Sequence, residues 1–435
     1  MNDLLIIGGE VVDRQGRRRA DVHVADGRIV AVGPPDEVSP AGGATTLDAT
    51  GCLVTPGFVD LHTHLREPGR EEAETIETGS RAAAKGGYTC VVAMPNTDPT
   101  QDTVSVIEFV RRQGELAGLC DVRPSGSITV GQAGTQLTPF AELAAAGVRI
   151  FTDDGFGVQD PLLMRRALEY ASDIRVDGRP IVLAQHCEVS RLTEGAVMHE
   201  GHCCSAFGLP GWPSIAEELM VFRDIELVRL TGAPLHVLHL STARSVELVR
   251  AAKADGLPVT AEATPHHISL TDERLAGYSP IFRVNPPLRT MDDVEAVRAG
   301  LADGTIDAIA TDHAPHTAET KERPLDQAPP GMLGLETALG VSLASLAMPV
   351  EDVVAAMTWR PAAIAGVDDV HGRPVAAGEP ANLCVFDPDE RWHVQPGELA
   401  SRSRNTPYVD VELRGRVRHT VLAGSPTVVD GSPTR

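Results

Sequence analysis

The sequence predicts an α/β protein whose central part is a (β/α)8 barrel, and three observations support this prediction. Between residues 55 and 368, eight short apolar runs alternate with helical segments, which is typical of parallel strands joined by helices. Nearly every run ends in a polar or ionisable side chain. Both ends of the chain, unlike this central part, look β-rich. A doubly wound sheet has the same alternation and stays open, but the count of eight favours the barrel.

The two ends of the chain share one sequence pattern. Residues 1–54 contain LLIIGGEVVD and ADVHVADGRIVAVG, in which apolar and polar residues alternate around the turn pairs GG and DG. Residues 369–435 continue in the same way with ANLCVFDPDERWHV and VDVELRGRVRHTVLAGSPTVVDG. Such segments predict short strands and hairpins. The two ends could therefore pair into one small sheet domain.

The central part supplies the strands and helices of the predicted barrel. The expected strands are GFVDLH (57–62), YTCVVAMP (88–95), CDVRPSGSIT (120–129), GVRIFTDD (147–154), PIVLAQHC (180–187), LHVLHLS (235–241), PVTAEATP (258–265) and IDAIATDH (306–313). Helix candidates between them are ETGSRAAAKG (77–86), PFAELAAAG (139–147), MRRALEYAS (164–172), IAEELMVFRDIELVRL (215–230) and SVELVRAAKADG (245–256). Strand carboxyl ends form the active-site face of such a barrel.

The net charge disfavours some classes of partner. The chain has 435 residues, 42% of them hydrophobic, and a formal net charge of −22. This charge disfavours nucleic acids and anionic membranes, because phosphates need basic patches. An anionic small molecule stays compatible, since a few placed arginines can hold one.

The cysteines and the first residues indicate a reduced, cytoplasmic protein. The seven cysteines are odd in number and lack CxxC pairs, so a disulfide framework is not expected. The first residues, MNDLLIIGGEVVD, carry no basic leader, and no apolar stretch reaches 18 residues. We therefore expect neither a signal peptide nor a membrane span.

Six ionisable residues at the predicted strand ends form a candidate metal site. In a strand, residues i and i+2 point to the same side, so His62 and His64 should emerge together. Imidazoles and carboxylates without thiolates suit zinc or a similar ion at a catalytic site. Six ligands exceed the need of one catalytic zinc ion, so a two-metal site with a bridging carboxylate fits better. The predicted ligands are His62, His64, Asp154, His186, His239 and Asp312.

Each candidate also has a structural interpretation. A lone buried histidine is more often a hydrogen-bonded core residue than a ligand, and aspartates at these positions often cap helices. His236 and His313 should face away from the site, Cys187 should be a small buried group, and at most one of His266 and His267 should face it. The segment TAETKERPLDQ (317–327) is expected to be a solvated loop, with a lid as the alternative.

The motifs resemble the dihydroorotase family, class I (bacterial type), within the amidohydrolase superfamily. The matching pieces span most of the central part, in the family's order: DLHTHLREPG (60–69), MPNTDP (94–99), FTDDG (151–155), QHCE (185–188), LHLST (238–242), RVNPPLR (283–289) and ATDHAPH (310–316). HxH alone is common in the superfamily, whereas HLREPG together with MPNT and NPPLR is specific to the family.

The resemblance implies a zinc-dependent enzyme with a β-sandwich domain formed from both termini. Its reaction is the reversible cyclisation of N-carbamoyl-L-aspartate to L-dihydroorotate in pyrimidine biosynthesis. His62, His64 and Asp312 match the ligands of one zinc ion, His186 and His239 those of a second, and Asp154 the bridging carboxylate. The residues that match substrate contacts are Arg66, Asn96, Asn285, His316, Pro330 and Gly331.

Two departures from relatives bear on these assignments. Many relatives bridge their metals with a carboxylated lysine, but Lys85, Lys253 and Lys321 are the only lysines and none follows the fourth strand, which leaves Asp154 as the bridge. PPGMLGLE lacks the aromatic residue that many relatives carry before the glycine, which weakens the Pro330 assignment.

The expected chemistry is hydrolysis of a cyclic amide. Bound zinc acidifies water, Asp312 is the expected general base and acid, and Arg66 can grip the substrate carboxylate. Three alternatives stay open: an allantoinase, a dihydropyrimidinase, or a non-catalytic scaffold for aspartate carbamoyltransferase. A homo-oligomer and a complex with that transferase are also compatible with the sequence.

Overall fold

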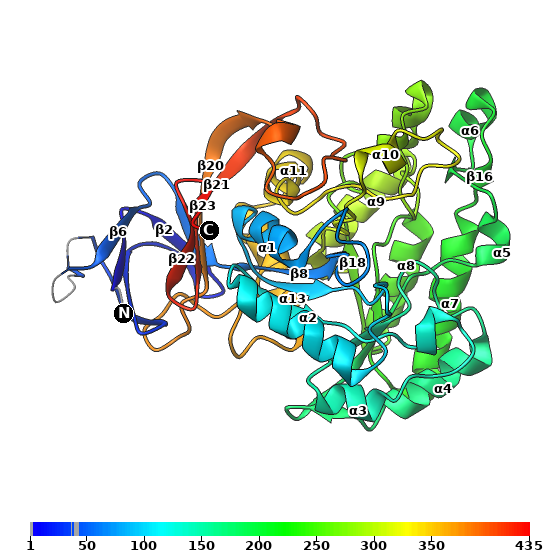
Figure 1. Ribbon diagram of the computed structural model, residues 1–435, viewed down its shortest axis with the longest axis horizontal. Coiled ribbons are helices and arrows are strands. Elements are labelled where there is room, and N and C mark those ends of the chain that lie inside the picture. Colours follow the sequence, from blue (N-terminus) through cyan, green and yellow to red (C-terminus); the bar gives the residue numbers. More distant parts are fainter. Residues whose placement is uncertain (1–2, 36, 39–42) are drawn as a thin grey trace.

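The computed structural model describes residues 3–35, 37–38 and 43–435. Strands from both chain ends lie together on one side of the molecule, and the helix-rich central part extends away from them (Figure 1). The strands of the central part are β8 (Phe58–Thr63), β9 (Tyr88–Ala93), β10 (Asp121–Pro124), β11 (Ile150–Thr152), β14 (Val182–Gln185), β17 (Leu235–Val237), β18 (Val259–Ala263) and β19 (Ala308–Ile309). Each coincides with one of the eight predicted apolar runs.

These strands form one ring of parallel neighbours. β8, β9 and β10 pair in one sheet, and β11, β14, β17, β18 and β19 pair in order in another. Parallel bridges between Gly126 and Phe151 and between Thr63 and His313 join the two sheets at both edges. The predicted α/β fold of the TIM-barrel type is therefore confirmed, and all carboxyl ends of the ring face one rim.

Helices follow the strands as the alternation predicts. Their starts carry local signals. Thr75 accepts a hydrogen bond from the Thr78 amide in a capping box. Asp160 caps the helix that begins with Pro161, and Thr242 caps the one that begins with Ala243. The helices of eight or more residues are α1 (Ile76–Lys85), α2 (Val104–Ala117), α4 (Pro161–Ala171), α7 (Ile215–Thr231), α8 (Ala243–Ala254), α9 (Met291–Ala302), α11 (Ala338–Ser345) and α12 (Val350–Met357).

Strands from the two termini share one sheet, as their common alternation of apolar and polar residues predicts. β7 (Leu53–Pro56) pairs with β2 (Glu10–Asp13) on one side and with β20 (Leu383–His393) on the other. The complete order is β23-β22-β21-β20-β7-β2-β3, and a second sheet has the order β5-β4-β1-β6. The remaining bounds are β1 (Leu4–Ile7), β3 (Gly16–Arg19), β4 (Asp21–Ala25), β5 (Arg28–Gly33), β6 (Thr45–Asp48), β21 (Glu412–Leu422), β22 (Ser425–Val429) and β23 (Ser432–Pro433).

Separate apolar clusters fill the two regions. The terminal sheets enclose a cluster that includes Ile6, Val22, Leu47 and Leu383, whereas the main cluster lies between the ring and its helices. All seven cysteines are free thiols, in agreement with the expected lack of disulfides. In the described part of the chain, no helix is long and apolar enough to cross a membrane.

Candidate metal centre

The six predicted ligands meet at the carboxyl rim of the strand ring. His62 lies near the end of β8, and the others follow β8, β11, β14, β17 and β19 in the loops. Each is at most 6% exposed. Five of them, all except His62, line one cavity of about 290 Å³. Strand ends that are far apart in sequence thus converge because parallel strands share one rim.

One half of the cluster is built from His62, His64 and Asp312. The Nε2 atoms of His62 and His64 lie 3.6 and 3.1 Å from Asp312 Oδ1. Both Nε2 atoms also lie 3.4 Å from Asp154 Oδ2. The three residues have ligand atoms within 4.8 Å of one another and could hold a metal ion.

The other half is built from His186 and His239. His186 Nδ1 and His239 Nε2 lie 3.4 and 3.6 Å from Asp154 Oδ1 and 2.9 Å from each other. Asp154 therefore directs one carboxylate oxygen to each half of the cluster. This division is what a carboxylate that bridges two ions requires.

The spacing and the unpaired atoms fit metal ligands. Tetrahedral ligation with bonds of 2.0–2.1 Å places neighbouring ligand atoms about 3.3 Å apart, and the nitrogen-to-oxygen distances of the cluster lie around this value. His62 Nε2 and Asp154 Oδ1 are buried without a hydrogen-bond partner. Buried polar atoms usually have partners, so these two atoms are suited to bind a cation.

Electrostatics give the same indication. Burial lowers the pKa of His62, but Asp154 and Asp312 outweigh it and raise the pKa well above its usual value. Burial raises the pKa of Asp154, but His62, His186 and His239 outweigh it and hold the pKa well below its ordinary range. The cluster thus stabilises positive charge at its centre.

Left-handed backbone turns aim several of these side chains. His239 and Asp312 have φ angles of 29° and 46°, and Arg66 has a φ of 61°. Such angles are costly for residues other than glycine and often mark functional sites. β17 ends at Val237, before the turn at His239, which is why His236 and His239 point to different places as predicted.

Carboxylates that support the ligating histidines are present in the structure but were not predicted from the sequence. Glu262 in β18 accepts hydrogen bonds from His62 Nδ1 at 2.8 Å and from His236 Nε2 at 3.0 Å. Burial raises its pKa, but these two histidines outweigh it and lower the pKa to about 2. Such partners fix the orientation and tautomer of a ligating imidazole. A glutamate inside the apolar run PVTAEATP is the signal that could have found it.

Two further side chains orient ligands in the same way. Glu188 accepts a hydrogen bond from His186 Nε2 at 2.9 Å, which leaves Nδ1 free for the centre. Asn96 Oδ1 accepts one from His64 Nδ1 at 2.9 Å. Asn96, predicted as a substrate contact, thus also holds a ligand in place.

The predicted substrate contacts all line the same cavity as the cluster. Arg66 Nε donates to the Pro315 carbonyl at 3.1 Å, and its Nη2 lies 3.4 Å from His316 Nε2. His316 Nε2 donates to the Pro330 carbonyl at 2.8 Å. Arg70 and Phe156, which were not predicted, also line this cavity, as do Asn96, Asn285, Pro330 and Gly331.

The structure tests the interpretations of the other candidates. Cys187 is buried in the main apolar cluster, and His313 turns away to Glu74, both as predicted. His267 donates to the Pro286 carbonyl, whereas His266 Nε2 is buried without a partner. Asp153 accepts hydrogen bonds from the amides of Ile128 and Thr129 and so supports a loop.

The prediction of a solvated loop over residues 317–327 is wrong in part. A short helix, α10 (Ala318–Lys321), occupies its start, and Lys321 is only 5% exposed. The Lys321 ammonium donates to two carbonyls of the following segment. The partners lie only 8 and 10 residues further along the chain, but backbone carbonyls leave no trace in local composition.

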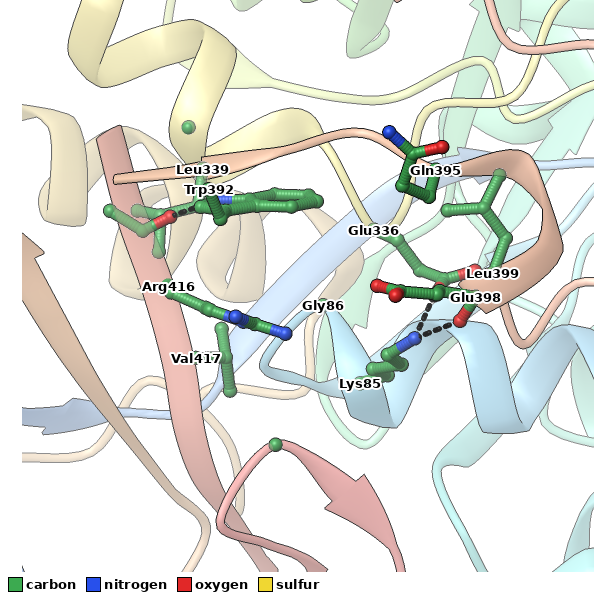
Figure 2. Close-up of a pocket in the computed structure, with 13 residues that line it drawn as sticks. Lys85, Gly86, Glu336, Leu339, Trp392, Gln395, Glu398, Leu399, Arg416 and Val417 are labelled. Carbon is green, nitrogen blue, oxygen red and sulfur yellow. Dashed lines mark hydrogen bonds and ion pairs between the residues drawn. The ribbon is translucent and has the colours of Figure 1, made fainter. Parts of the chain in front are cut away.

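A second pocket lies between α1, α11 and β21 (Figure 2). Trp392 donates to the Gly415 carbonyl, and Lys85 is already paired with Glu336 at 3.1 Å and with the Glu398 carbonyl. The cavity holds about 40 Å³, far less than the roughly 290 Å³ of the cavity at the rim cluster.

The ring of strands, with a histidine–aspartate cluster at its rim, belongs to a class of folds that includes solved hydantoinases. An L-hydantoinase (dihydropyrimidinase) from Arthrobacter aurescens has the same fold, with a TM-score of 0.86 and 24% identity over 100% of this chain and 98% of the other. The D-hydantoinase from Thermus sp. matches with a TM-score of 0.83, 24% identity and coverage of 99% and 96%.

Sequence relatives narrow this class. The chain is 51% identical to the dihydroorotase of Streptomyces coelicolor over 100% of both chains. It is also 51% identical to the dihydroorotase of Mycobacterium tuberculosis, over 95% of this chain and 96% of the relative. The model of the Dihydro-orotase-like family matches residues 51–245. The chain belongs to the dihydroorotase family.

Proposed function

We propose that the chain catalyses the reversible hydrolysis of L-dihydroorotate to N-carbamoyl-L-aspartate, the third step of pyrimidine biosynthesis. One observation carries this choice of substrate. Arg66 is 6% exposed and lines the cavity beside the metal cluster, yet no carboxylate among the described residues forms an ion pair with it. Burial and the neighbouring Arg70 lower its pKa to about 10, so it remains cationic at neutral pH. A buried cation without a counter-ion favours a substrate that brings a carboxylate.

We further propose that the six clustered residues hold two zinc ions. His62, His64 and Asp312 would bind one ion, His186 and His239 the other, and Asp154 both, which corresponds to class I of the family. Bound zinc would supply acidified water and polarise the scissile carbonyl. The donor set of imidazoles and carboxylates, with two unpaired buried atoms, fits this ion.

The protein's own residues would hold the ring and move the proton. Asp312 lies on the cavity wall, where its carboxylate can take a proton from the attacking water and return it to the departing ring nitrogen. Burial raises the pKa of Asp312, but His62 and His64 outweigh it and keep the pKa below its usual value. The carboxylate is therefore ionised at neutral pH, which is the form that a general base requires.

Arg66 would bind the substrate carboxylate, with Asn96, Asn285 and His316 beside it. Pro330 would act through its carbonyl, which accepts from His316; this accounts for the tolerance of proline where relatives carry an aromatic residue. Gly331 has a φ of 130°, and a Cβ there would lie 2.7 Å from Ala314 Cβ. Only glycine lets this segment approach the site so closely.

The remaining assignments follow from the same proposal. We propose a barrel domain over residues 55–368 and a β-sandwich domain from residues 1–54 and 369–435, because a separate apolar cluster fills the terminal sheets. We also propose a cytoplasmic location, which agrees with a biosynthetic role. Sedimentation of the chain alone and with aspartate carbamoyltransferase would test a homo-oligomer and that complex.

The decisive assay compares substrates on one zinc-loaded sample. Dihydroorotate, dihydrouracil, hydantoin and allantoin are offered to the same enzyme, and kcat/KM is measured for each. We expect turnover of dihydroorotate and a strong preference over the rings without a carboxylate. Preference for an uncharged ring would assign the chain to another cyclic amidohydrolase, and no turnover of any ring would favour a scaffold.

A further inference from the structure

The segment after α10 forms one wall of the substrate cavity and is held by cations. Pro329, Pro330 and Gly331 all line the cavity. Among the described residues, neither Lys321 nor Arg283, the two cations packed behind this segment, forms an ion pair with a carboxylate. Both instead donate to its backbone carbonyls.

Lys321 holds two carbonyls that flank Pro330. Its Nζ donates to the carbonyls of Pro329 and Gly331, each at 3.0 Å. The intervening Pro330 carbonyl has a different partner and accepts from His316 Nε2 at 2.8 Å. Because Lys321 holds the carbonyls on both sides, the backbone that carries the Pro330 carbonyl has little freedom to turn.

Arg283 anchors the beginning of the same segment. Its Nη1 donates to the carbonyls of Leu325 and Ala328 at 2.7 and 2.8 Å. The Gly331 amide donates back to the Arg283 carbonyl at 2.9 Å. The backbone from residue 325 to 331 is therefore tied at both ends, and the Lys321 ammonium holds the end that touches the cavity.

An ammonium is an expensive group to bury for packing alone. Lys321 is 5% exposed, and burial together with Arg283 lowers its pKa to about 7. Apolar side chains would fill such a position at less cost in solvation. The two hydrogen bonds to the cavity wall are what the ammonium adds.

We propose that Lys321 is a positioning residue for substrate binding. By fixing the carbonyls of residues 329 and 331, it sets the Pro330 carbonyl and the His316 ring in the geometry that receives the substrate carboxylate beside Arg66. The inference rests on the proposed dihydroorotase function. The metal cluster is built from other strand ends, so Lys321 should affect substrate affinity much more than the chemical step.

The test measures KM and kcat for dihydroorotate in Lys321→Met, Lys321→Arg and Lys253→Met. Lys253→Met is the matched control, because Lys253 pairs with Asp307 and the Gly304 carbonyl at the amino side of β19. For Lys321→Met we expect KM to rise about tenfold or more while kcat changes less than about threefold. Lys321→Arg, which keeps the charge and the donors, should restore KM in large part, and Lys253→Met should leave KM unchanged.

The outcomes separate this inference from the proposed function. A wild-type enzyme without dihydroorotase activity overturns the proposed function itself. An active wild type whose KM is unchanged in Lys321→Met, or an equal loss of kcat and no rescue by Lys321→Arg, overturns only the role of Lys321. If Lys321→Met does not fold, Arg283→Met replaces it with the same expected rise in KM, and an unchanged KM there rejects the positioning role.

Discussion

Two groups of metal-capable side chains lie at opposite ends of the same ring of strands. At the carboxyl ends, the histidine–aspartate cluster leaves His62 Nε2 and Asp154 Oδ1 buried and unpaired. At the amino ends, Cys90, Asp121 and His371 also bring ligand atoms within 4.8 Å of one another. Proximity alone therefore does not separate them.

Hydrogen bonding does separate them. His371 Nε2 donates to Asp121 Oδ2 at 2.9 Å, and its Nδ1 lies 3.1 Å from the Thr89 hydroxyl. Arg123 also pairs with Asp121, at 2.7 Å. Burial raises the pKa of Cys90 well above its usual value, so its sulfur stays a thiol, which is a poor metal ligand. The amino-end group is a satisfied ion pair, whereas the rim cluster keeps two unpaired ligand atoms that a cation could use.

The largest effect should come from Asp154→Ala. This change removes the carboxylate that both halves of the cluster share, so kcat/KM should fall by at least about a thousandfold. The measurement is dihydroorotate hydrolysis on folded protein, verified by circular dichroism. Near-normal turnover in this variant would contradict a shared bridge.

Metal removal should have the next largest effect, and zinc content should distinguish the rim cluster from the amino-end group. Dialysis against a chelator should abolish activity, and added zinc should restore it. His371→Asn should bind as much zinc as the wild type, because we expect the hydrogen-bonded amino-end group to bind none. The activity assay checks the first expectation, and mass spectrometry of metal content checks the second. Loss of zinc in His371→Asn would show that the amino-end group binds the metal.

Glu262→Gln should weaken the rim cluster without dismantling it. The amide cannot serve as a charged acceptor for both His62 and His236, so we expect zinc affinity to fall by about 10–100-fold. Competition with a chromogenic chelator measures this affinity. Glu188→Gln should have a similar effect through His186. Wild-type zinc affinity in both variants would show that these carboxylates do not support the ligating histidines.

Asp121→Asn should have the smallest effect on function. Losing the carboxylate partner of His371 should lower the free energy of unfolding by about 1–3 kcal/mol, while kcat and zinc content stay unchanged. Burial raises the pKa of Asp121, but His371 and Arg123 outweigh it and lower the pKa. Its contribution is therefore present above about pH 4 and lost at lower pH. Denaturant unfolding at several pH values measures this contribution to the free energy of unfolding. A loss of activity in Asp121→Asn as large as that in the rim variants would show that the amino-end group takes part in catalysis.

The sequence predicted the ring and the rim because both depend on local patterns. Eight apolar runs mark the strands, and polar residues at their ends mark the rim, so His186 and His239 could be grouped before any contact was known. Periodicity also separated His236 from His239. These predictions needed only the rule that parallel strands share one active-site face.

The supporting contacts could not be predicted because they join residues that are far apart in sequence. Glu262 reaches His62 across 200 positions, and nothing around Glu262 names its partner. Lys321 lies in a charged segment that is typical of a solvated loop, yet a turn of helix buries it against two carbonyls. Tertiary packing overrode local composition at these positions.

Anomalous X-ray diffraction at the zinc edge, on crystals grown with zinc, tests the central claim most directly. We predict two peaks at the rim, one among His62, His64 and Asp312 and one beside His186 and His239, with Asp154 in contact with both. A peak at Cys90, Asp121 and His371, or a rim without any peak, would contradict the account.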